Sequence, residues 1–412
     1  MWQKNNKYYL PLVFVILILA ALLRLGYVLM LEEKVHWVDE QDYLTLAASM
    51  VDDMEYRLED GTVTAFRPPG YPFLLAGLRA LGVRGILEIR LFQVVLSVLT
   101  LVILFAIARR LGGRGAALIS ITIGALYPYF IFICGTLYAT VWFSFLLLAS
   151  VYLLIAGIQE NNLLKIIASG CFMGGVVLTR TSALVLGVVA LLWLIISTSA
   201  NKRRSFIVAV LFSISMSIFI APWVIRNMTV LGKATLSTNG GRNFWLGNNP
   251  QSTINSGSNI EMPLSLEERV SKVSETNADR VYIQEALTHI RENPGHYLWL
   301  SVKKGLCLWR LDPSPTTEGY SSLNRLYPFI SILSYTPLIV LAIIGFVRAQ
   351  KLQRQMMWLW VGFALGYTLL HAVFITKVRF RIPLDHFIIV MASIPVIQWW
   401  ARIKHQPVTT QQ

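Results

Sequence analysis

Stretches of predominantly apolar residues, each long enough to cross a bilayer, constrain this chain more than any other feature. We count ten of them, at roughly 10–31, 89–108, 115–134, 137–157, 163–180, 182–199, 205–225, 326–347, 356–376 and 384–401. A helix of about 20 apolar residues spans the hydrocarbon core and satisfies its own backbone polar groups. Only 14% of the 412 residues are charged, whereas a soluble domain carries about a quarter. The sequence therefore predicts an all-α polytopic membrane protein with about ten transmembrane helices.

The basic residues of the short loops predict the orientation. Lys and Arg gather in ARRLGGRG, NKRRS, VRAQKLQRQ and the tail ARIKHQ. With ten spans these segments all fall on the side of the N-terminus, which the positive-inside rule makes cytoplasmic. The net charge of +14 then reflects topology rather than nucleic-acid binding, and 21 of the 22 carboxylates lie at the outer side. We expect a multi-pass protein of a bacterial inner membrane with both termini in the cytoplasm.

Two long outer, periplasmic loops divide the chain. An N-terminal transmembrane module, 1–225, contains the first loop, 32–88; residues 226–325 form the second loop region and 326–412 the last helices. Apolar residues recur with helical spacing in DEQDYLTLAASMVDDM, which predicts a helix lying on the membrane surface. The second loop begins with turn-rich STNGGRNFWLGNNP, followed by a helix from about Leu264 to Glu292 that ends at NPG. HYLWLSVKKGLCLW is expected to be interfacial.

Three acids follow the first apolar stretch, in VHWVDEQDY. Asp39 can be a helix N-cap with Asp42 at the third helical position, and capping alone would explain both. Asp39 and Glu40, however, come where the chain leaves the first helix, at the mouth of any cavity between helices. A carboxylate there can take a proton from an acceptor hydroxyl, so a catalytic base is the alternative to capping.

Several cations lie at the outer side, against the positive-inside bias. Arg67 precedes PPGYP, whose prolines would hold a guanidinium in place for a phosphate. Arg180 ends the fifth helix and Arg24 lies in the first; snorkelling to the interface would explain either one. VRFRIPLDHF and the Lys before it group three cations, Lys377, Arg379 and Arg381, which suggests an anionic ligand.

Other signatures are missing from the sequence. Three widely spaced cysteines form no disulfide framework or metal-ligand pattern, and no Walker or dinucleotide motif occurs. A carboxylate base beside a phosphate clamp suits one type of reaction, in which an acceptor nucleophile attacks a sugar carbon while a lipid-linked phosphate leaves.

In the order of its motifs the chain resembles the GT-C membrane glycosyltransferases, in particular the superfamily of protein O-mannosyltransferases and lipid A aminoarabinose transferases. The resemblance covers most of the chain. Its elements are WVDEQDYLTLA, FRPPGYPFLLAG, LTRTSAL, GRNFWLGNNP, EALTHIRENPGHYLWLSVKKGLCLW and VRFRIPLDHFIIVMA. It implies an inverting transferase that uses a polyprenyl-phosphate sugar and an envelope acceptor, with no nucleic-acid partner.

The resemblance also implies roles for particular residues. The base would be Asp39, with Glu40 beside it. The ligands of the donor phosphate would be Arg67, Arg180, Arg379, Arg381 and Lys377. Acceptor or sugar contacts would fall on Tyr71, His371 and Asp385. Family members differ in metal dependence, so a divalent cation stays open as a cofactor although no metal site is readable. The large C-terminal soluble domain of some members has no counterpart here, which leaves acceptor recognition to residues 226–325.

Two other functions share parts of this pattern. A transporter or flippase of lipid-linked sugars would also bind a lipid phosphate, but transporters typically carry internal repeats and ionisable residues near the bilayer midplane. A polymerase or ligase of lipid-linked glycans would share the substrates but not these motifs. The sequence does not identify the sugar or the acceptor.

Overall fold

The computed structural model describes residues 7–257, 259–311 and 326–403 of the chain. Within these ranges every regular element is an α-helix or a 3₁₀-helix, and Arg57 and Val63 form an isolated β-bridge. The all-α polytopic fold expected from the sequence is confirmed.

In the part of the chain that the structure describes, seven helices are long and apolar enough to cross a membrane. They are α1 (Tyr9–Leu29), α4 (Ile86–Leu126), α6 (Thr140–Gln159), α9 (Lys202–Leu231), α14 (Leu326–Arg348), α15 (Lys351–Val373) and α16 (Ile382–Ile403). Two shorter apolar helices, α7 (Leu163–Thr179) and α8 (Leu184–Ser197), match the fifth and sixth predicted stretches. All ten apolar stretches are therefore largely helical, while their number as membrane spans stays a prediction.

Helix α4 accounts for two predicted stretches because it turns back on itself. Gly113 has φ +74° and ψ −168° inside its 41 residues, a conformation that favours glycine. A Cβ added to Gly124 would lie 2.7 Å from the Leu101 side chain, so the segments before and after Gly113 pack against each other. The segment after the turn is continued by α5 (Pro128–Phe132) and the 3₁₀-helix η1 (Ile133–Gly135).

Arg24 holds this helical pair against α1. Its side chain is fully buried and donates to Ser97 Oγ at 2.8 Å, to the Gly124 carbonyl at 2.9 Å and to the Ala125 carbonyl at 3.2 Å. A guanidinium at these last carbonyls of α4 is favourably placed for the helix dipole. Arg24 is therefore a structural residue in the interior of the bundle, and the snorkelling explanation for it was wrong.

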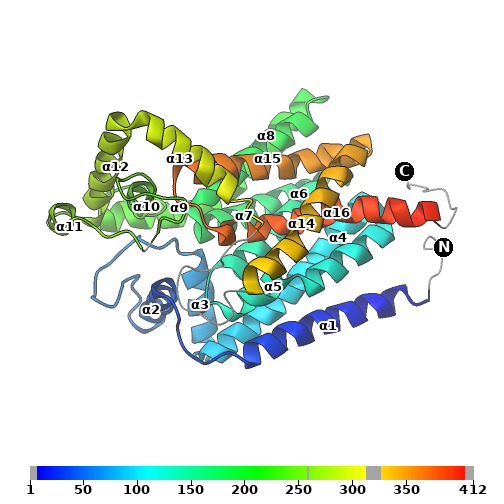
Figure 1. Cartoon of the computed structure of the whole chain (residues 1–412), viewed down its shortest axis with the longest axis horizontal. Helices are drawn as coiled ribbons and strands as arrows, with labels where there is room; N and C mark the ends of the chain where they lie inside the picture. Colours follow the sequence, from blue (N-terminus) through cyan, green and yellow to red (C-terminus); the bar gives the residue numbers. More distant parts are fainter. Residues whose placement is uncertain (1–6, 258, 312–325, 404–412) are drawn as a thin grey trace.

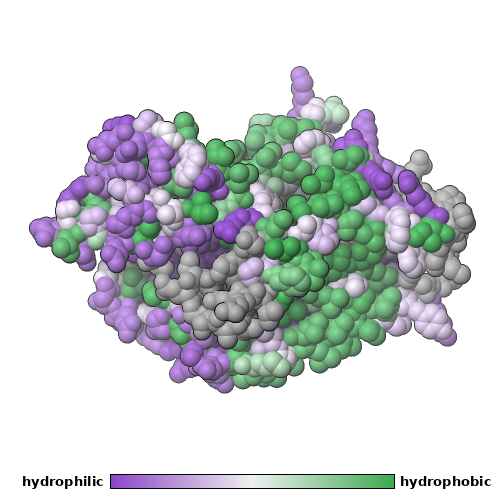
Figure 2. Space-filling view, in the orientation of Figure 1, coloured by the Kyte–Doolittle hydropathy of each residue, from purple (hydrophilic) through white to green (hydrophobic). Residues whose placement is uncertain are grey.

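The helices of the two long loops lie together at one end of the bundle, and the start of α1 and the end of α16 lie at the other end (Figure 1). The loop helices are α2 (Val38–Asp52), α3 (Gly70–Ala80), α10 (Gly240–Gly247), α11 (Leu264–Ser271), α12 (Glu275–Glu292) and α13 (Pro294–Cys307). Figure 2 shows a broad belt of hydrophobic side chains over the bundle and hydrophilic ones over the end that carries α10 to α12. This distribution is the one expected of a bundle that crosses a bilayer.

Hydrogen bonds join the two loops to each other. The Glu275 carboxylate accepts from the Ala65 backbone N–H at 3.0 Å and from the Thr238 hydroxyl, and the Thr238 N–H donates to the Ala65 carbonyl at 3.1 Å. Arg226, in α9, donates to the Thr64 carbonyl at 2.8 Å. The segment before α3 is thus fixed by the second loop as well as by its own prolines.

The second loop departs from the sequence prediction in two places. The helix expected from Leu264 to Glu292 is broken into α11 and α12, and Ser274 between them is extended, with φ −62° and ψ 155°. Leu266 and Tyr282 share one core cluster, whereas in a continuous helix they would lie about 24 Å apart. The stretch expected to be turn-rich contains helix α10, whose buried Trp245 completes the same cluster.

Helix α13 has the two faces expected of an interfacial helix. Leu298, Val302 and Leu306 are exposed at a spacing of four residues. Lys304, in contrast, is buried, and its ammonium donates to the carbonyls of Gly247 at 3.1 Å and Val373 at 3.3 Å. Burial lowers the pKa of Lys304 to about 8. This lysine therefore ties α13 to the ends of α10 and α15 instead of reaching the water.

Candidate active site at the loop end of the bundle

The acids after α1 do not cap a helix. Helix α2 has Trp37 at its N-cap position, and no side chain makes a capping hydrogen bond there. Asp39 and Glu40 lie in the first turn, where negative charge is favourable for the helix dipole. Of the two interpretations that the sequence left open for Asp39, capping is therefore wrong, and Asp42, placed at the third helical position in that interpretation, binds Arg67 instead.

Glu40 is fully buried and holds α2 in position. One carboxylate oxygen accepts from the His36 N–H at 2.9 Å and the other from the Leu137 N–H at 2.8 Å. Leu137 lies in the segment between η1 and α6. Glu40 thus fixes the first turn of α2, and with it Asp39, beside the start of α6. Its predicted share in the catalysis stays a prediction.

Asp39 lies between two arginines from distant parts of the chain. One carboxylate oxygen is 2.7 Å from Nη2 of Arg67 and the other is 3.1 Å from Nη2 of Arg379, which belongs to the 3₁₀-helix η3 (Val378–Phe380). Its side chain is 26% exposed, so solvent reaches it. Burial by itself would raise the pKa of Asp39, but the charges of Arg67 and Arg379 outweigh it and lower the pKa. Asp39 is therefore ionised at neutral pH.

Arg67 bridges the two aspartates of α2. Besides Asp39, its guanidinium contacts Asp42 Oδ2 through Nε at 2.9 Å and Nη2 at 2.7 Å. The rings of Phe66 and Tyr43 lie 5.1 and 5.7 Å from its central carbon. The structure thus brings the predicted phosphate ligand Arg67 into direct contact with the predicted base.

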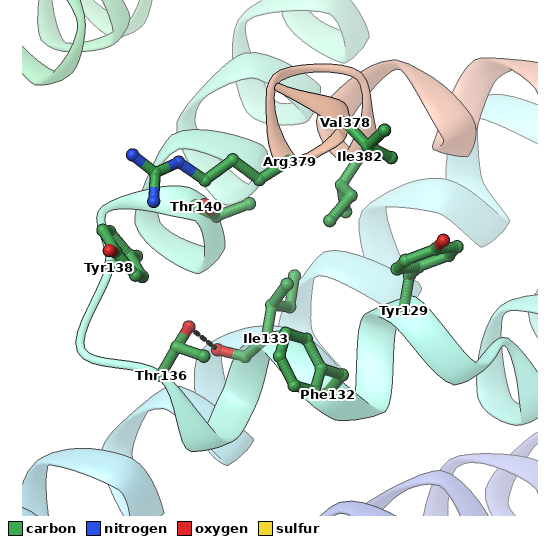
Figure 3. Close-up of a pocket in the computed structure, with 9 residues that line it drawn as sticks. All are labelled: Tyr129, Phe132, Ile133, Thr136, Tyr138, Thr140, Val378, Arg379 and Ile382. Carbon is green, nitrogen blue, oxygen red and sulfur yellow. Dashed lines mark hydrogen bonds between the residues drawn. The ribbon is translucent and has the colours of Figure 1, made fainter. Parts of the chain in front are cut away.

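Arg379 lines a small pocket with side chains from η1 and the start of α6 (Figure 3). Its guanidinium lies 4.3 Å from the centre of the Tyr138 ring, and Ile133 and Ile382 form an apolar wall of the pocket. Thr140, on the same wall as Tyr138, accepts a hydrogen bond from Arg180 Nη2 at 2.7 Å. Arg180 comes directly after α7, at the loop end where the sequence placed it.

Arg180 has one unused donor. Its guanidinium packs on the rings of Phe143 and Phe380 at 5.1 and 5.6 Å, and its Nη1 atom is buried with no hydrogen-bond partner among the described residues. An unsatisfied buried guanidinium N–H costs free energy, which an anionic ligand would recover. Arg180 and Arg379 share the Phe380 ring and the neighbourhood of Thr140, so they form one side of a common site.

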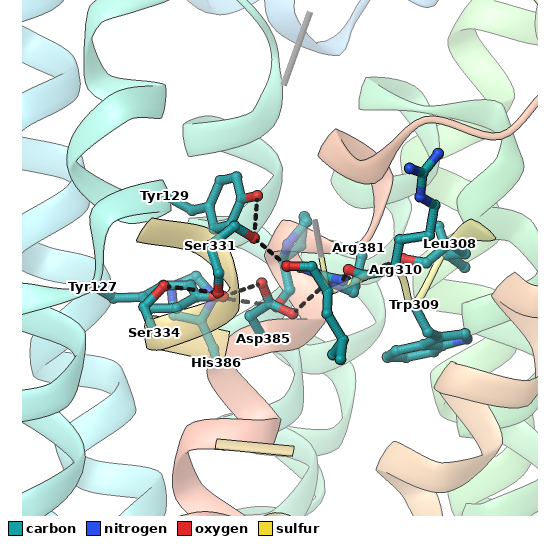
Figure 4. A network of polar contacts seen from close by, with 12 residues as sticks. Tyr127, Tyr129, Leu308, Trp309, Arg310, Ser331, Ser334, Arg381, Asp385 and His386 are labelled. Carbon is teal, nitrogen blue, oxygen red and sulfur yellow. Dashed lines mark hydrogen bonds and ion pairs between the residues drawn. The ribbon is translucent and has the colours of Figure 1, made fainter. Parts of the chain in front are cut away.

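Two further predicted cations point away from this site. Arg381 is fully buried, 3.1 Å from Asp385, and its Nη1 donates to the Arg310 carbonyl at 3.0 Å (Figure 4). Asp385 also accepts from the Tyr127 hydroxyl at 2.9 Å. Lys377 donates to the Asn255 carbonyl at 3.0 Å; burial and then the charge of Arg379 lower its pKa to about 8.

The two remaining predicted contacts are packed behind the site. Tyr71 is buried, donates to Gln93 Oε1 at 3.3 Å and meets the Tyr43 ring edge-on at 5.2 Å. His371 is buried and stacks on Phe380 at 4.5 Å, and its Nδ1 lies 3.0 Å from the Ile375 carbonyl. Both support rings that in turn contact the arginines.

Sequence reasoning missed Tyr138 and Thr140. They lie in GTLYATVW, at the outer end of a predicted span, where an uncharged Tyr or Thr gives little signal among apolar residues. A search for polar side chains near the outer ends of spans, close to those that carry Arg180 and Arg379, would have found them.

The described residues contain no group of three or more His, Cys, Asp or Glu side chains that could hold a metal ion. The two neighbouring carboxylates Asp39 and Asp42 are bridged by Arg67, which lies where a cation between them would have to bind. The residues present therefore do not fit a divalent cation at this point of the site.

The buried pair Arg381–Asp385 gives the first testable prediction. Arg381→Ala should destabilise the protein by about 3–5 kcal/mol, because it leaves a buried carboxylate without its partner. Replacing both residues with apolar ones, Arg381→Met with Asp385→Leu, should recover most of the loss. Thermal unfolding of the purified protein in detergent measures both. A single variant as stable as the unaltered chain would mean that the pair does not hold the fold.

Comparisons with known proteins bear on this site. Residues 66–225 match the family model described as dolichyl-phosphate-mannose-protein mannosyltransferase. That segment contains Arg67, Tyr138, Thr140 and Arg180. No curated protein sequence matches the chain.

Solved structures share the fold. The archaeal oligosaccharyltransferase AglB from Archaeoglobus fulgidus, in complex with an inhibitory peptide and a dolichol-phosphate, has a TM-score of 0.58 at 12% identity, over 100% of this chain and 53% of its own. Its apo form gives 0.59 at 11% identity, over 98% and 52%. The chain thus spans about half the length of AglB. ArnT from Cupriavidus metallidurans, bound to undecaprenyl phosphate, gives 0.47 at 12% identity, over 97% and 80%.

The family-model match contains neither Asp39 nor Arg379, and the shared fold extends over the whole chain. Together they confirm the resemblance to GT-C membrane glycosyltransferases of the protein mannosyltransferase type.

Proposed function

We propose that this chain is an inverting glycosyltransferase, which moves a sugar from a polyprenyl-phosphate carrier to a cell-envelope acceptor at the outer face of the membrane. The observation that carries the proposal is the contact of Asp39 with Arg67 and Arg379, beside an Arg180 that keeps an unused donor. The family model and the AglB fold support the reaction class.

Arg180 and Arg379 are the proposed ligands of the donor phosphate. They come from different helices but share the Phe380 ring. Arg180 has a buried Nη1 without a partner, and Arg379 binds Asp39 through a single 3.1 Å contact. Guanidinium groups bind phosphate oxygens in a fork geometry, so a phosphate between the two would satisfy Arg180 and draw Arg379 away from Asp39.

Asp39 is the proposed base. Two arginines lower its pKa, which makes the carboxylate a weak proton acceptor while both remain bound to it. A phosphate that takes over Arg379 removes part of this stabilisation and so raises the basicity of Asp39. The proton of the acceptor hydroxyl passes to Asp39, and the oxygen of that hydroxyl bonds to the anomeric carbon of the sugar. The bond from this carbon to the phosphate oxygen breaks on the opposite face.

The leaving lipid phosphate keeps the electron pair of the broken bond. Arg180 and Arg379 would stabilise the charge that develops on it, in a site where burial makes such interactions strong. Glu40 acts as a positioning residue in this scheme, because its two hydrogen bonds hold the first turn of α2 beside α6.

Transfer is tested with the purified protein in liposomes. A panel of polyprenyl-phosphate sugars carrying a labelled sugar is offered together with an envelope extract as the source of acceptor. A transferase moves label from the lipid to the extract and releases polyprenyl phosphate. A flippase instead moves labelled lipid between leaflets with its sugar still attached, and that result would reject the proposal.

The orientation gives a second testable prediction. Single cysteines are introduced at Ser271 in α11 and Ser199 between α8 and α9, both exposed, in a chain whose native cysteines are replaced. In intact spheroplasts Ser271→Cys should react with a membrane-impermeant maleimide, and Ser199→Cys should react only after permeabilisation. The reverse labelling pattern would put Asp39 on the cytoplasmic side and overturn the proposed orientation.

A further inference from the structure

A second, larger cavity lies in the layer formed by the two loops. It is a cleft of about 390 Å³, a volume in the usual range for ligand sites. Its walls come from both loops: Phe66 precedes α3, Arg242 lies in α10, Glu267 and Ser271 lie in α11, and Tyr282 lies in α12. The hydrogen bonds between Glu275, Ala65 and Thr238 hold these walls together, so the cleft is built into the fold.

Phe66 connects the cleft to the proposed base. Arg242 lies 5.6 Å from the centre of its ring, and Arg67, which holds Asp39, lies 5.1 Å from the same centre. One aromatic side chain thus separates the cleft from the residue that contacts the carboxylate. The cleft and the proposed base are therefore separated by two side chains, Phe66 and Arg67.

The groups that face the cleft are of two kinds. Phe66 offers aromatic surface. The ring of Tyr282 is buried against Trp245, and its hydroxyl has only a weak contact among the described residues, with the sulfur of Met262 at 3.7 Å. The side chains of Arg242 and Glu267 make no hydrogen bond or ion pair with any described residue, which leaves a set of donors and a set of acceptors for a ligand. Aromatic faces with donors and acceptors beside them suit a molecule that has apolar faces and many hydroxyl groups.

The charge of the cleft selects against an anion. Glu267, Glu275 and Asp279 line it against the single guanidinium of Arg242. Asp279 is partly neutralised by Lys233 at 3.7 Å, and Glu275 is bound to the other loop. Acidic side chains outnumber basic ones in the cleft, whereas arginines predominate around Arg180 and Arg379. We therefore expect a lipid phosphate beside the two arginines and an uncharged polyol in the cleft.

We propose that this cleft binds the saccharide part of the acceptor and presents one of its hydroxyl groups to Asp39. The inference rests on the proposed transferase function and adds a substrate class and a second subsite to it. Phe66 stacks on a sugar ring, and Arg242, Glu267 and the hydroxyl of Tyr282 bind hydroxyl groups of the saccharide. Occupancy of the cleft is then needed for transfer but not for binding of the lipid donor.

The test fills the cleft from its rim. Ser271→Trp places an indole in the cleft, and Ser265→Trp, on the same exposed helix but outside the cleft, is the matched control. Sugar transfer to an envelope extract and binding of polyprenyl phosphate are measured separately. Ser271→Trp should lose at least tenfold in transfer and keep its affinity for polyprenyl phosphate, while Ser265→Trp should keep both. Normal transfer by Ser271→Trp, or an equal loss of lipid binding, would overturn the assignment.

Direct binding separates this inference from the proposed function. Maltotriose, chitotriose and mannotriose are offered to the purified protein, and saturation-transfer NMR reports contact with each. At least one trisaccharide should bind the unaltered chain, and Tyr282→Phe or Arg242→Ala should weaken that binding, by about tenfold for Arg242→Ala. Trialanine should not bind. Absence of any saccharide binding, or binding of trialanine alone, would overturn the inference. If the unaltered chain did not bind polyprenyl phosphate, that result would instead contradict the proposed lipid-phosphate donor.

Discussion

Asp39→Asn should yield a stable, correctly inserted protein that binds the lipid-linked donor and transfers almost no sugar. The amide keeps the shape of the carboxylate and can still accept a hydrogen bond from Arg67, so the fold around α2 should persist. It cannot take a proton from the acceptor, and loss of a positioned general base typically costs about 10²–10⁴-fold in rate. The measurement is transfer of labelled sugar in membranes, normalised to the amount of protein.

Donor binding should not fall in this variant. Among the described residues Asp39 is the only ion-pair partner of Arg379, which loses it when Asp39 becomes neutral, whereas Arg67 keeps Asp42. A free Arg379 is at least as available to a phosphate as a paired one. Binding of polyprenyl phosphate to Asp39→Asn should therefore equal or exceed that of the unaltered chain, which separates a lost base from a damaged donor site.

Asp42→Asn is the matched control. It removes the same charge from the same helix, three residues further on, and also removes a partner of Arg67, but it leaves both Asp39 contacts in place. We expect a loss of less than about tenfold, because its part in the scheme is only to orient Arg67. Equal losses in the two variants would mean that the charge of the cluster matters and not a base. Near-normal transfer by Asp39→Asn would reject the base assignment.

Most of the fold could be predicted because hydropathy is a local property. Each apolar stretch can be recognised within about 20 residues, and the basic loops predict on which side of the membrane each connection lies. The structure differs from the prediction where residues far apart in the sequence decide the outcome. From the sequence alone, Arg24 looks like a charge near the bilayer surface. In the structure it binds carbonyls of the last turn of α4, which lie about 100 residues further along the chain. The pattern of Leu264–Glu292 predicts one helix. In the structure Leu266 and Tyr282 both pack against the cluster that contains Trp245, which requires two helices.

The candidate site was predictable in its members but not in its pairing. The sequence singles out Asp39, Arg67 and Arg379 by charge and position, yet it does not show that the carboxylate contacts both arginines. The cations 377, 379 and 381 alternate in the sequence, which in a strand would put them on one face. In the structure Arg379 lies within η3, and Lys377 and Arg381 flank it at the two ends. A 3₁₀-helix has about three residues per turn, so the three side chains point in different directions. Arg379 alone reaches Asp39.

Arg379→Ala should weaken donor binding and lower the transfer rate, while the protein still inserts and accumulates. Arg379 lines the pocket beside Tyr138 and is one of two proposed donors to the leaving phosphate. Removing one such donor typically costs about 10²–10³-fold in turnover. Lys377→Ala is the control, because it removes a neighbouring cation that is bound to the Asn255 carbonyl, and it should lose far less. Equal losses, or a loss of protein with normal specific activity, would contradict the phosphate role.

The same variant also makes a prediction about pH. The charge of Arg379 helps to lower the pKa of Asp39, so its removal should raise that pKa. Transfer requires the ionised carboxylate and falls as the pH drops through this pKa. The acidic limb of the pH profile of kcat/KM should therefore move to higher pH in Arg379→Ala and stay in place in Lys377→Ala. An acidic limb that does not move in Arg379→Ala would mean that the group titrating there is not Asp39. A residual rate with a shifted limb would show that Arg379 acts on both the phosphate and the base.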